Sequence, residues 1–147
     1  MPEPWPQLGG RITGGVHVLP VRVYYEDTDF SGAVYHANYL KFCERGRSDY
    51  LRLLGIHHHL LDDMVFVVQR MVCDFLKPAR IDDLLEVETR FVEQVGARFE
   101  ISQRVKRATD SLFTAQVTAA LVDGRGRPKR LPKEMAAVLK CHPESES

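Results

Sequence analysis

The amino-acid sequence predicts one α+β domain in which an antiparallel sheet packs against a single long helix. A strand-like segment comes first, and a long amphipathic helix follows it. Four more strand-like segments then come one after another, an order typical of an antiparallel sheet covered by a helix on one face. The chain has 147 residues, which suits one domain of ordinary size and leaves no room for a second.

The first strand is predicted over residues 17–25, whose sequence HVLPVRVYY is rich in Val and Tyr. Pro20 has no backbone N–H, so part of this strand should lie at an edge or a bulge. The helix is predicted over residues 37–54, and Gly55 is a natural C-terminal stop. Its apolar residues recur at steps of three and four and should form the buried face: Tyr39, Cys43, Gly46, Tyr50 and Leu53 or Leu54.

The remaining strands are predicted over residues 65–76, 84–95, 98–107 and 112–122. Apolar and charged residues alternate along parts of the second and third of these segments, as in strands with one buried face. Short turn sequences, Gly96-Ala97 and Asp123-Gly124, punctuate this part of the chain. Residues 132–140 should form a short terminal helix with Pro132 in its first turn.

The predicted domain spans residues 17–140. Residues 1–16 are rich in Pro and Gly and should form a flexible arm, and residues 141–147 a flexible tail. Because long strands leave sheet edges that a second copy can cover, we expect a homo-oligomer.

Composition excludes several classes of protein. The 20 basic and 20 acidic residues give a formal net charge of zero, which argues against general nucleic-acid binding. No apolar run approaches the roughly 20 residues of a membrane-spanning helix, and no signal-peptide core opens the sequence. The three cysteines, Cys43, Cys73 and Cys141, include no CxxC pair. They fit reduced thiols of a cytoplasmic protein better than a disulfide framework or a zinc site.

A candidate site lies where the first strand leads into the helix. An acidic turn, Glu26-Asp27-Thr28-Asp29, precedes a loop containing Gly32, and the helix begins near His36. A carboxylate is thus held close to a helix N-terminus, whose free N–H groups can bind a developing oxyanion. Asp29 is the catalytic candidate, as nucleophile or as general base. The alternative for Asp29 is a capping or turn residue, and Asp27 is predicted to be structural, accepting turn amides.

Residues around Asp29 have several possible roles. The His36 amide, with those of Tyr35 and Ala37 as competitors, could donate to the oxyanion, and the His36 imidazole could orient water or shuttle protons. Tyr25 and Asn38 could line an acyl pocket or hold the helix start. Tyr39 is predicted to lie in the core. Glu44 could be a second pocket acid, although a solvated helix acid is the simpler interpretation.

Other motifs carry less weight. The run His57-His58-His59 does not predict a metal site, because adjacent side chains diverge and the spacing fits no zinc motif. No P-loop, GxGxxG or GxSxG motif occurs in the sequence. Cations cluster near the turn that contains Gly124 and Gly126, where they could bind coenzyme A phosphates, meet an acidic acyl carrier protein or remain solvated: Arg125, Arg127, Lys129, Arg130 and Lys133.

The segment DTDFSGAVYHANYLKFCERGRSDYL resembles the start of hotdog-fold acyl-CoA thioesterases of the 4-hydroxybenzoyl-CoA thioesterase and Tol-Pal-associated (YbgC-like) type. The order of elements agrees over about residues 17–140 of the chain. The spacing D-x-D-x-x-G-x-V-x-H-x-N-Y carries the resemblance through Asp27, Asp29, Gly32, Val34, His36, Asn38 and Tyr39. It implies a curved sheet wrapped around one long helix, dimers that often pair into tetramers, and active sites between subunits.

The resemblance also implies that Asp29 is the catalytic carboxylate and that an amide near His36 polarises the thioester carbonyl. We assign the surrounding oxyanion site and pocket to Tyr25, Gly32, Val34, Tyr35 and Asn38. The expected reaction converts an acyl-CoA and water into a carboxylic acid and free CoA, with no cofactor beyond the CoA of the substrate. The alternatives are a dehydratase acting on acyl thioesters and a non-hydrolytic module that binds acyl carrier protein or an envelope complex. The acyl group, the choice between anhydride and general-base chemistry, and the choice between dimer and tetramer stay open.

Overall fold

The computed structural model describes residues 4–56 and 63–140. Its strands are β1 (Arg11–Thr13), β2 (Val16–Arg22), β3 (Val65–Phe75), β4 (Leu84–Val95), β5 (Arg98–Arg107), β6 (Asp110–Val122) and β7 (Pro128–Lys129). The helices are α1 (Asn38–Leu53), α2 (Lys133–Lys140) and a short 3-10 turn, η1 (Tyr25–Asp27). The predicted α+β class is confirmed, and the long helix and the later strands lie within a few residues of their predicted bounds.

All strands belong to one antiparallel sheet of seven strands, in the order β1-β2-β4-β5-β6-β3, with β7 paired to the end of β6. Of the strands after the helix, β4, β5 and β6 pair in succession. β3 pairs with β6 instead of β4, and β4 pairs with β2 on its other side. Short turns make β4, β5 and β6 neighbours, which leaves only the outer edges of β4 and β6 free. β3 is partly exposed along its length, which suits an edge strand.

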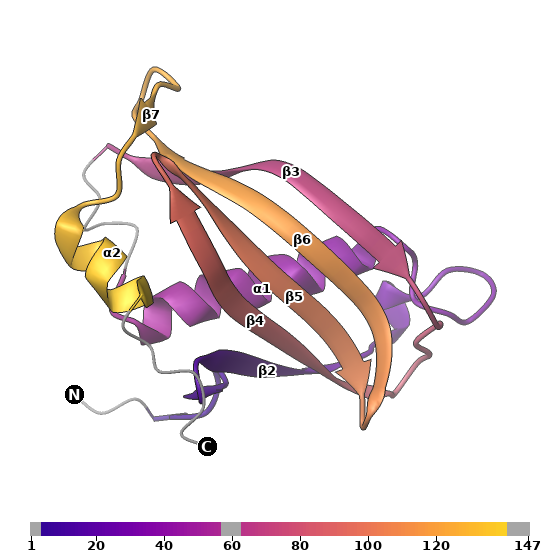
Figure 1. Cartoon of the computed structure of the whole chain (residues 1–147). Helices are drawn as coiled ribbons and strands as arrows, with labels where there is room; N and C mark the ends of the chain where they lie inside the picture. Colours follow the sequence, from indigo (N-terminus) through magenta and orange to yellow (C-terminus); the bar gives the residue numbers. More distant parts are fainter. Residues whose placement is uncertain (1–3, 57–62, 141–147) are drawn as a thin grey trace.

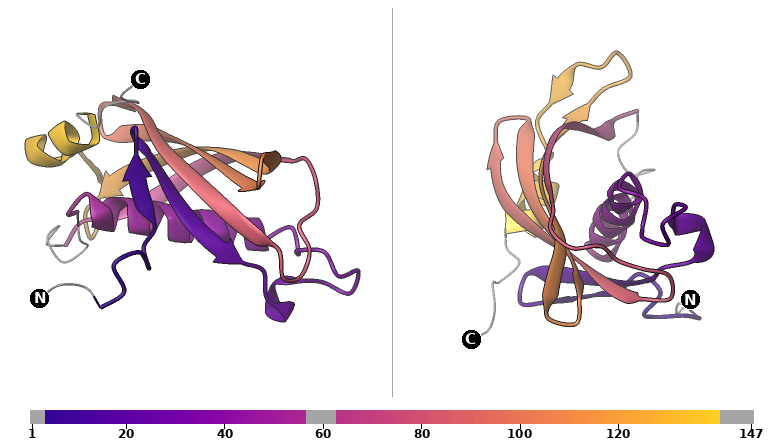
Figure 2. Two further views of the ribbon diagram at one scale, coloured as in Figure 1. Left: turned by 90° about the horizontal axis from the view of Figure 1, so that it is seen from below. Right: turned by 90° about the vertical axis from the view of Figure 1, so that its right-hand side faces the viewer.

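The sheet curves around α1, which lies along its concave side (Figure 1; Figure 2, right). The predicted alternation is confirmed in β5, where Phe99, Ile101 and Val105 are buried and face the helix side of the sheet. Residues of α1 complete this core, and Phe42, Cys43 and Tyr50 are almost fully enclosed. The core therefore lies between one face of the helix and the concave face of the sheet.

Gly46 fixes how closely α1 approaches the sheet. A Cβ at this position would lie 2.9 Å from Thr89 Oγ1 and 2.9 Å from Val87 Cγ1. Beside it, the buried Gln103 donates through Nε2 to the Cys43 carbonyl and to Thr89 Oγ1, both at 2.9 Å. The glycine on the predicted stripe is thus buried as expected, and it packs closely against side chains of the sheet.

The end of the helix differs from the predicted stripe. Leu53 is 44% exposed, and Leu51 and Ile56 are buried instead. The chain turns at Gly55, whose φ is +83°, and the Ile56 amide bonds back to the Leu51 carbonyl at 2.9 Å. This C-terminal turn brings Ile56 into the core. Ile56 and Leu51 complete the buried face at this end of the helix, and Leu53 lies outside it.

The N-terminal segment is more ordered than the predicted flexible arm. Residues 11–13 form β1, which pairs with β2 through a turn at Gly14 and Gly15, both with positive φ. His17 is fully buried, and its Nε2 lies 2.7 Å from the Gly9 carbonyl oxygen. The predicted boundary at residue 17 therefore cuts through a hairpin. The first strand also ends at Arg22, and Tyr25 belongs to η1.

Candidate active site

Backbone hydrogen bonds hold the loop between β2 and α1, both within the loop and to the segment that contains Ala79. The Asp29 amide donates to the Ala33 carbonyl at 2.9 Å, and the Gly32 amide donates to the Asp29 carbonyl at 3.0 Å. Gly32 has a φ of +84°, a conformation that side-chain-bearing residues rarely adopt. The buried Val34 donates its amide to Ala79 at 2.8 Å. Gly32 and Val34 therefore shape the loop through their backbones.

Asp27 is the buried anchor of this loop. Its carboxylate accepts from the Tyr24 amide at 2.8 Å and from Asn38 Nδ2 at 2.9 Å. Its carbonyl accepts the Tyr35 amide at 2.9 Å. The predicted structural role of Asp27 is confirmed, and Asn38 holds the helix start through its side chain.

Asp29 is exposed, and one of its carboxylate oxygens is held by Ser31. Oδ1 accepts from the Ser31 amide at 2.8 Å and from Ser31 Oγ at 2.5 Å. These two bonds, together with the nearby His36, hold the pKa of Asp29 below its usual value. Oδ2 has no hydrogen-bond partner among the described residues. The carboxylate is thus ionised at neutral pH, with one oxygen available.

The helix start offers two amides as oxyanion donors. Tyr35 donates its amide to Asp27, so in this arrangement it has no hydrogen to offer. Within residues 4–56 and 63–140, the amides of His36 and Ala37 have no hydrogen-bond partner. They stand immediately before Asn38, where α1 begins and the helix dipole favours negative charge. Of the three amides considered from the sequence as oxyanion donors, those of His36 and Ala37 therefore remain as candidates, and that of Tyr35 does not.

Aromatic rings surround this helix start. The His36 ring lies 4.5 Å from the Tyr35 ring and 6.2 Å from that of Phe75, centroid to centroid. Tyr39 is buried as predicted and stacks on Phe113 at 4.9 Å. Tyr25 is 82% exposed, so among the described residues its side chain is largely uncovered. Sequence reasoning missed Phe75, because nothing near the end of β3 indicates that it meets the helix start.

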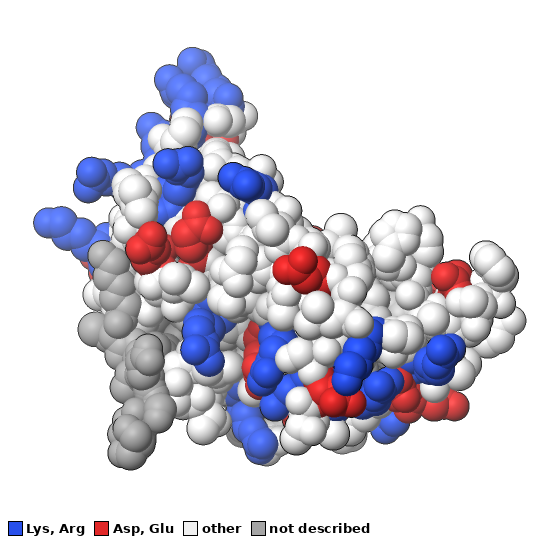
Figure 3. Space-filling view, turned by 45° about the vertical axis from the view of Figure 1, so that its right-hand side comes forward, with Lys and Arg blue, Asp and Glu red and all other residues white. Residues whose placement is uncertain are grey.

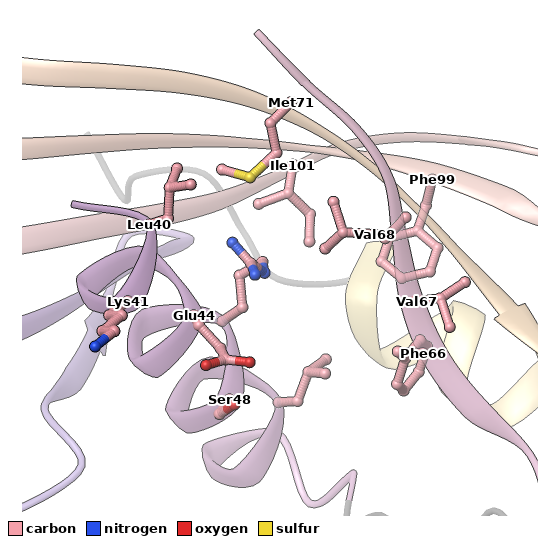
Figure 4. Close-up of a pocket in the computed structure, with 13 residues that line it drawn as sticks. Leu40, Lys41, Glu44, Ser48, Phe66, Val67, Val68, Met71, Phe99 and Ile101 are labelled. Atoms are coloured by element: carbon pink, nitrogen blue, oxygen red, sulfur yellow. The ribbon is translucent and has the colours of Figure 1, made fainter. Parts of the chain in front are cut away.

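A groove of about 580 Å³ lies further along α1, between the helix and β3 (Figure 4). Its helix wall combines apolar residues with charged and polar ones, and its strand wall is apolar. Glu44 lies on the helix wall, so this acid does face a cavity. Asp29 is not among the lining residues, which are Leu40, Lys41, Glu44, Arg47, Ser48, Leu51, Phe66, Val67, Val68, Met71, Phe99, Ile101 and Ala119.

The cationic cluster lies on the β6–β7 hairpin, at the opposite end of the molecule from the Asp29 loop (Figures 1 and 3). Arg127 Nε and Lys129 Nζ lie 3.1 and 3.8 Å from the Asp123 carboxylate. Arg125 and Arg130 are exposed. One copy of the chain therefore does not bring these cations to Asp29.

Among the described residues, no group of three or more His, Cys, Asp or Glu is placed to hold a metal ion. The run His57-His58-His59 lies outside those residues. In the same part of the chain, no helix combines the length and apolarity that crossing a membrane requires.

Fold and site together define a class of protein: a hotdog domain whose loop places a carboxylate near a helix start. Residues 31–114 match the family model described as the Thioesterase superfamily, and this match covers more than half of the chain. The chain belongs to that family. The match begins two residues after Asp29, so it does not itself include the carboxylate.

Individual relatives narrow the class. The chain is 47% identical over 125 residues to the acyl-CoA thioesterase YbgC of Haemophilus influenzae, an alignment covering 82% of this chain and 92% of that protein. It is 40% identical over 129 residues to the acyl-CoA thioester hydrolase YbgC of Escherichia coli O157:H7, covering 82% and 93%. A solved structure of a probable thioesterase from Bartonella henselae is 46% identical, with a TM-score of 0.77, covering 80% and 99%. The resemblance to YbgC-like thioesterases is thus confirmed.

Proposed function

We propose that this chain hydrolyses acyl-CoA thioesters to a carboxylic acid and free CoA. The observation that carries the proposal is the pairing of an ionised Asp29, held by Ser31, with two unpartnered amides at the start of α1. The names of the YbgC relatives support the same reaction. A cytoplasmic location belongs to the proposal, because Cys43 and Cys73 are free thiols.

The proposed chemistry has two forms. In the first, Oδ2 of Asp29 takes a proton from a water molecule as that water attacks the thioester carbonyl. In the second, Oδ2 itself attacks and gives a mixed anhydride, which water then cleaves. In both, the amides of His36 and Ala37 hold the oxyanion, which collapses and expels the CoA thiolate. A thiol with a pKa near 8.5 leaves without a strong acid beside it.

The substrate is bound between two copies in this proposal. β3 leaves one side unpaired at the sheet edge, and it exposes apolar side chains such as Val68, Val72 and Phe75. A homodimer formed along this edge would cover them, and two dimers could associate further into a tetramer. Sedimentation velocity over a concentration series distinguishes monomer, dimer and tetramer.

The basic hairpin has a place in the same proposal. Arg125 and Arg130 make no ion pair among the described residues, whereas Arg127 and Lys129 share Asp123. The four cations would bind the phosphates of coenzyme A on the site of a neighbouring copy, because they are remote from Asp29 of their own chain. An acyl carrier protein, which is acidic, is a second substrate carrier that this surface could accept.

The test is thiol release from a panel of short, long, branched and aromatic acyl-CoAs, with wild type and Asp29→Asn compared side by side. We expect turnover by wild type and a loss of about a hundredfold or more in the variant, since the carboxylate takes part in bond making. Chelator is included throughout, because the proposed reaction needs no metal or other cofactor. A variant that keeps near-normal rates with intact circular dichroism would remove Asp29 from the mechanism.

A further inference from the structure

Tyr39 carries a hydroxyl group into an aromatic part of the core. The residue is only 4% exposed, and its ring stacks on that of Phe113 at 4.9 Å, centroid to centroid. The rings of Phe42 and Phe75 pack edge-on against it at 6.2 and 5.9 Å. Phenylalanine would fill the same space without a buried polar atom that needs a partner. The hydroxyl group at this position therefore points to a role beyond packing.

The partner of this hydroxyl group lies in the loop between β3 and β4, residues 76–83. The fully buried Ala79 donates its amide to Tyr39 Oη at 3.0 Å. The carbonyl of Ala79 accepts the amide of Val34 at 2.8 Å. Ala79 thus bonds to the first turn of α1 through its N–H and to the Asp29 loop through its C=O. One residue of a third segment joins the two parts of the candidate site.

Hydrogen bonds in series therefore run from the helix start to the carboxylate residue. Beyond Ala79 the series continues through Ala33, whose carbonyl accepts the Asp29 amide at 2.9 Å. At its other end, Tyr39 lies in the first turn of α1, directly after the amides of His36 and Ala37. Those amides are the proposed oxyanion donors. The series thus joins the proposed donors to the proposed carboxylate.

The covalent path from Asp29 to the helix start needs such support. Residues 29–31 are exposed, and Gly32 adopts a φ of +84°. Glycine restricts its backbone less than any other residue, so the path through it does not fix a distance. Asp27 holds the later part of the path, because its carbonyl accepts the Tyr35 amide. The earlier part depends on its bonds to the loop between β3 and β4.

That loop is itself held at several points. The Asp83 carboxylate accepts from the Arg80 amide at 2.9 Å and pairs with Arg107 of β5 at 2.8 Å. The Val23 amide, just after β2, donates to the Asp83 carbonyl at 2.9 Å. Because three segments share these bonds, the loop gives Ala79 a defined position from which to hold its two neighbours.

We infer that Tyr39 is a positioning residue of the proposed reaction: through Ala79, its hydroxyl group keeps the Asp29 carboxylate in place relative to the oxyanion amides. This role rests on the proposed thioester hydrolysis, whereas the holding of the Asp29 loop can be measured without that reaction.

Tyr39→Phe removes the hydroxyl group and little else. The Ala79 amide loses its acceptor, so the Asp29 loop is held less firmly and its carboxylate is less often at reacting distance. We expect kcat for acyl-CoAs to fall about tenfold and the Michaelis constant to change by less than about twofold, because Tyr39 acts on the reacting geometry. Hydrogen–deuterium exchange of the peptide that covers residues 28–36 should become faster.

Tyr50→Phe is the matched control. Tyr50 is as deeply buried in α1, about three turns further along and beside His17. The control removes the same atom from the same helix, so it reports the effect of losing a buried hydroxyl group far from the site. Its kcat and its exchange over residues 28–36 should match wild type. Urea unfolding of both variants separates any loss of stability from the effect on the site.

Several outcomes would overturn the role of Tyr39. Unchanged exchange over residues 28–36 in Tyr39→Phe would do so, as would an unchanged kcat or an equal fall of kcat in Tyr50→Phe. Should Tyr39→Phe fail to fold, Asp83→Ala replaces it, because it frees the Arg80 amide and breaks the pair with Arg107. A normal kcat in Asp83→Ala would then contradict the positioning.

The same assays separate this role from the proposed function. An active wild type whose Tyr39→Phe variant keeps full kcat leaves the hydrolysis standing and overturns the positioning. A wild type that releases no thiol from any acyl-CoA of the panel refutes the hydrolysis, and a catalytic effect of Tyr39 falls with it. In that case the exchange data still decide whether Tyr39 holds the Asp29 loop.

Discussion

At the scale of single residues, Asp29 and Asp27 show how two similar carboxylates acquire different roles. Asp27 is buried, and its oxygens are occupied by Tyr24 and Asn38. Asp29 is exposed, and Ser31 occupies only its Oδ1. The sequence places both in one acidic turn, but only the fold leaves Oδ2 of Asp29 open to a substrate. That difference favours Asp29 as the reacting carboxylate.

Ser31→Ala tests how the carboxylate is held. Loss of the Oγ hydrogen bond should let the pKa of Asp29 rise toward its usual value, since that bond is the largest cause of its lowering. Asp29 reacts in its charged form, so activity is lost as pH falls through this pKa, and the acid limb of the pH–rate profile should move to higher pH in the variant. Ser102→Ala, on the sheet, is the control. Coincident acid limbs for wild type and Ser31→Ala would contradict the assignment.

His17 gives a second prediction, on stability. Burial holds the pKa of His17 below its usual 6.5, so the folded protein binds a proton less readily than the unfolded chain. The contribution of His17 to stability is therefore complete above pH 6.5 and declines as pH falls below it, by up to about 1.4 kcal/mol per pH unit. Urea unfolding between pH 7.5 and 5 should show this decline, and His17→Gln should flatten it. An equal slope in both proteins would assign the decline to other groups.

At the scale of elements, α1 is positioned by its contact with β4 and β5 at Gly46. A Cβ at residue 46 would crowd Thr89 and Val87 at 2.9 Å and Gln103 Nε2 at 3.2 Å. A normal contact distance would require the helix or these side chains to shift. The same contact orients Gln103, which in turn holds Arg47 at the groove. One small residue therefore links helix packing to the groove.

Gly46→Ala should destabilise the fold by about 1–2 kcal/mol, because overpacking of the core outweighs the higher helix propensity of Ala. Chemical denaturation measures this change. Arg45→Ala, at the neighbouring exposed position, should stay within about 0.5 kcal/mol of wild type. A Gly46→Ala protein as stable as wild type would mean that the sheet yields at this contact.

Most elements could be predicted from the sequence because their signals are local. Alternation along residues 98–107 and the stripe of α1 follow from burial on one face, and both appear in the structure. The pairing of β3 with β6 could not be predicted from local sequence patterns. It depends on which strand edges remain free after β4, β5 and β6 have formed hairpins. The short β1 was missed because Gly14-Gly15 was interpreted as part of a loose arm instead of a hairpin turn.

The candidate site was predictable in its residue types but not in its hydrogen bonds. Asp29 and the helix start follow from the order of a carboxylate, a glycine loop and an amphipathic segment. The engagement of the Tyr35 amide by Asp27 and the holding of Asp29 by Ser31 depend on the folded loop. Asp side chains in turns often accept from the backbone amide two residues on, which could have indicated the bond from the Ser31 amide to Asp29.

At the scale of the whole molecule, the basic hairpin and the Asp29 loop occupy opposite ends (Figure 1). Arg125→Gln combined with Arg130→Gln should raise the Michaelis constant for acyl-CoA several-fold and leave kcat nearly unchanged, if these cations bind the phosphates. Acyl-pantetheine, which lacks those phosphates, is the control substrate and should be unaffected. Equal effects on both substrates would indicate a structural role for the hairpin.

The pairing of β3 with β6 has a consequence for how the chain is made. Val65 pairs with Val122 and Phe75 with Phe113, so β3 leaves the ribosome before β4, β5 and its own partner exist. The hairpins of β4, β5 and β6 can form between strands that are close in sequence. The apolar faces of α1 and β3 stay exposed until the later strands have been synthesised. A nascent chain that stops short of β6 keeps an unpaired, valine-rich strand, a form prone to aggregation. Synthesis of β6 therefore gives β3 its one strand partner within the chain and ends the period in which both sides of β3 are unpaired.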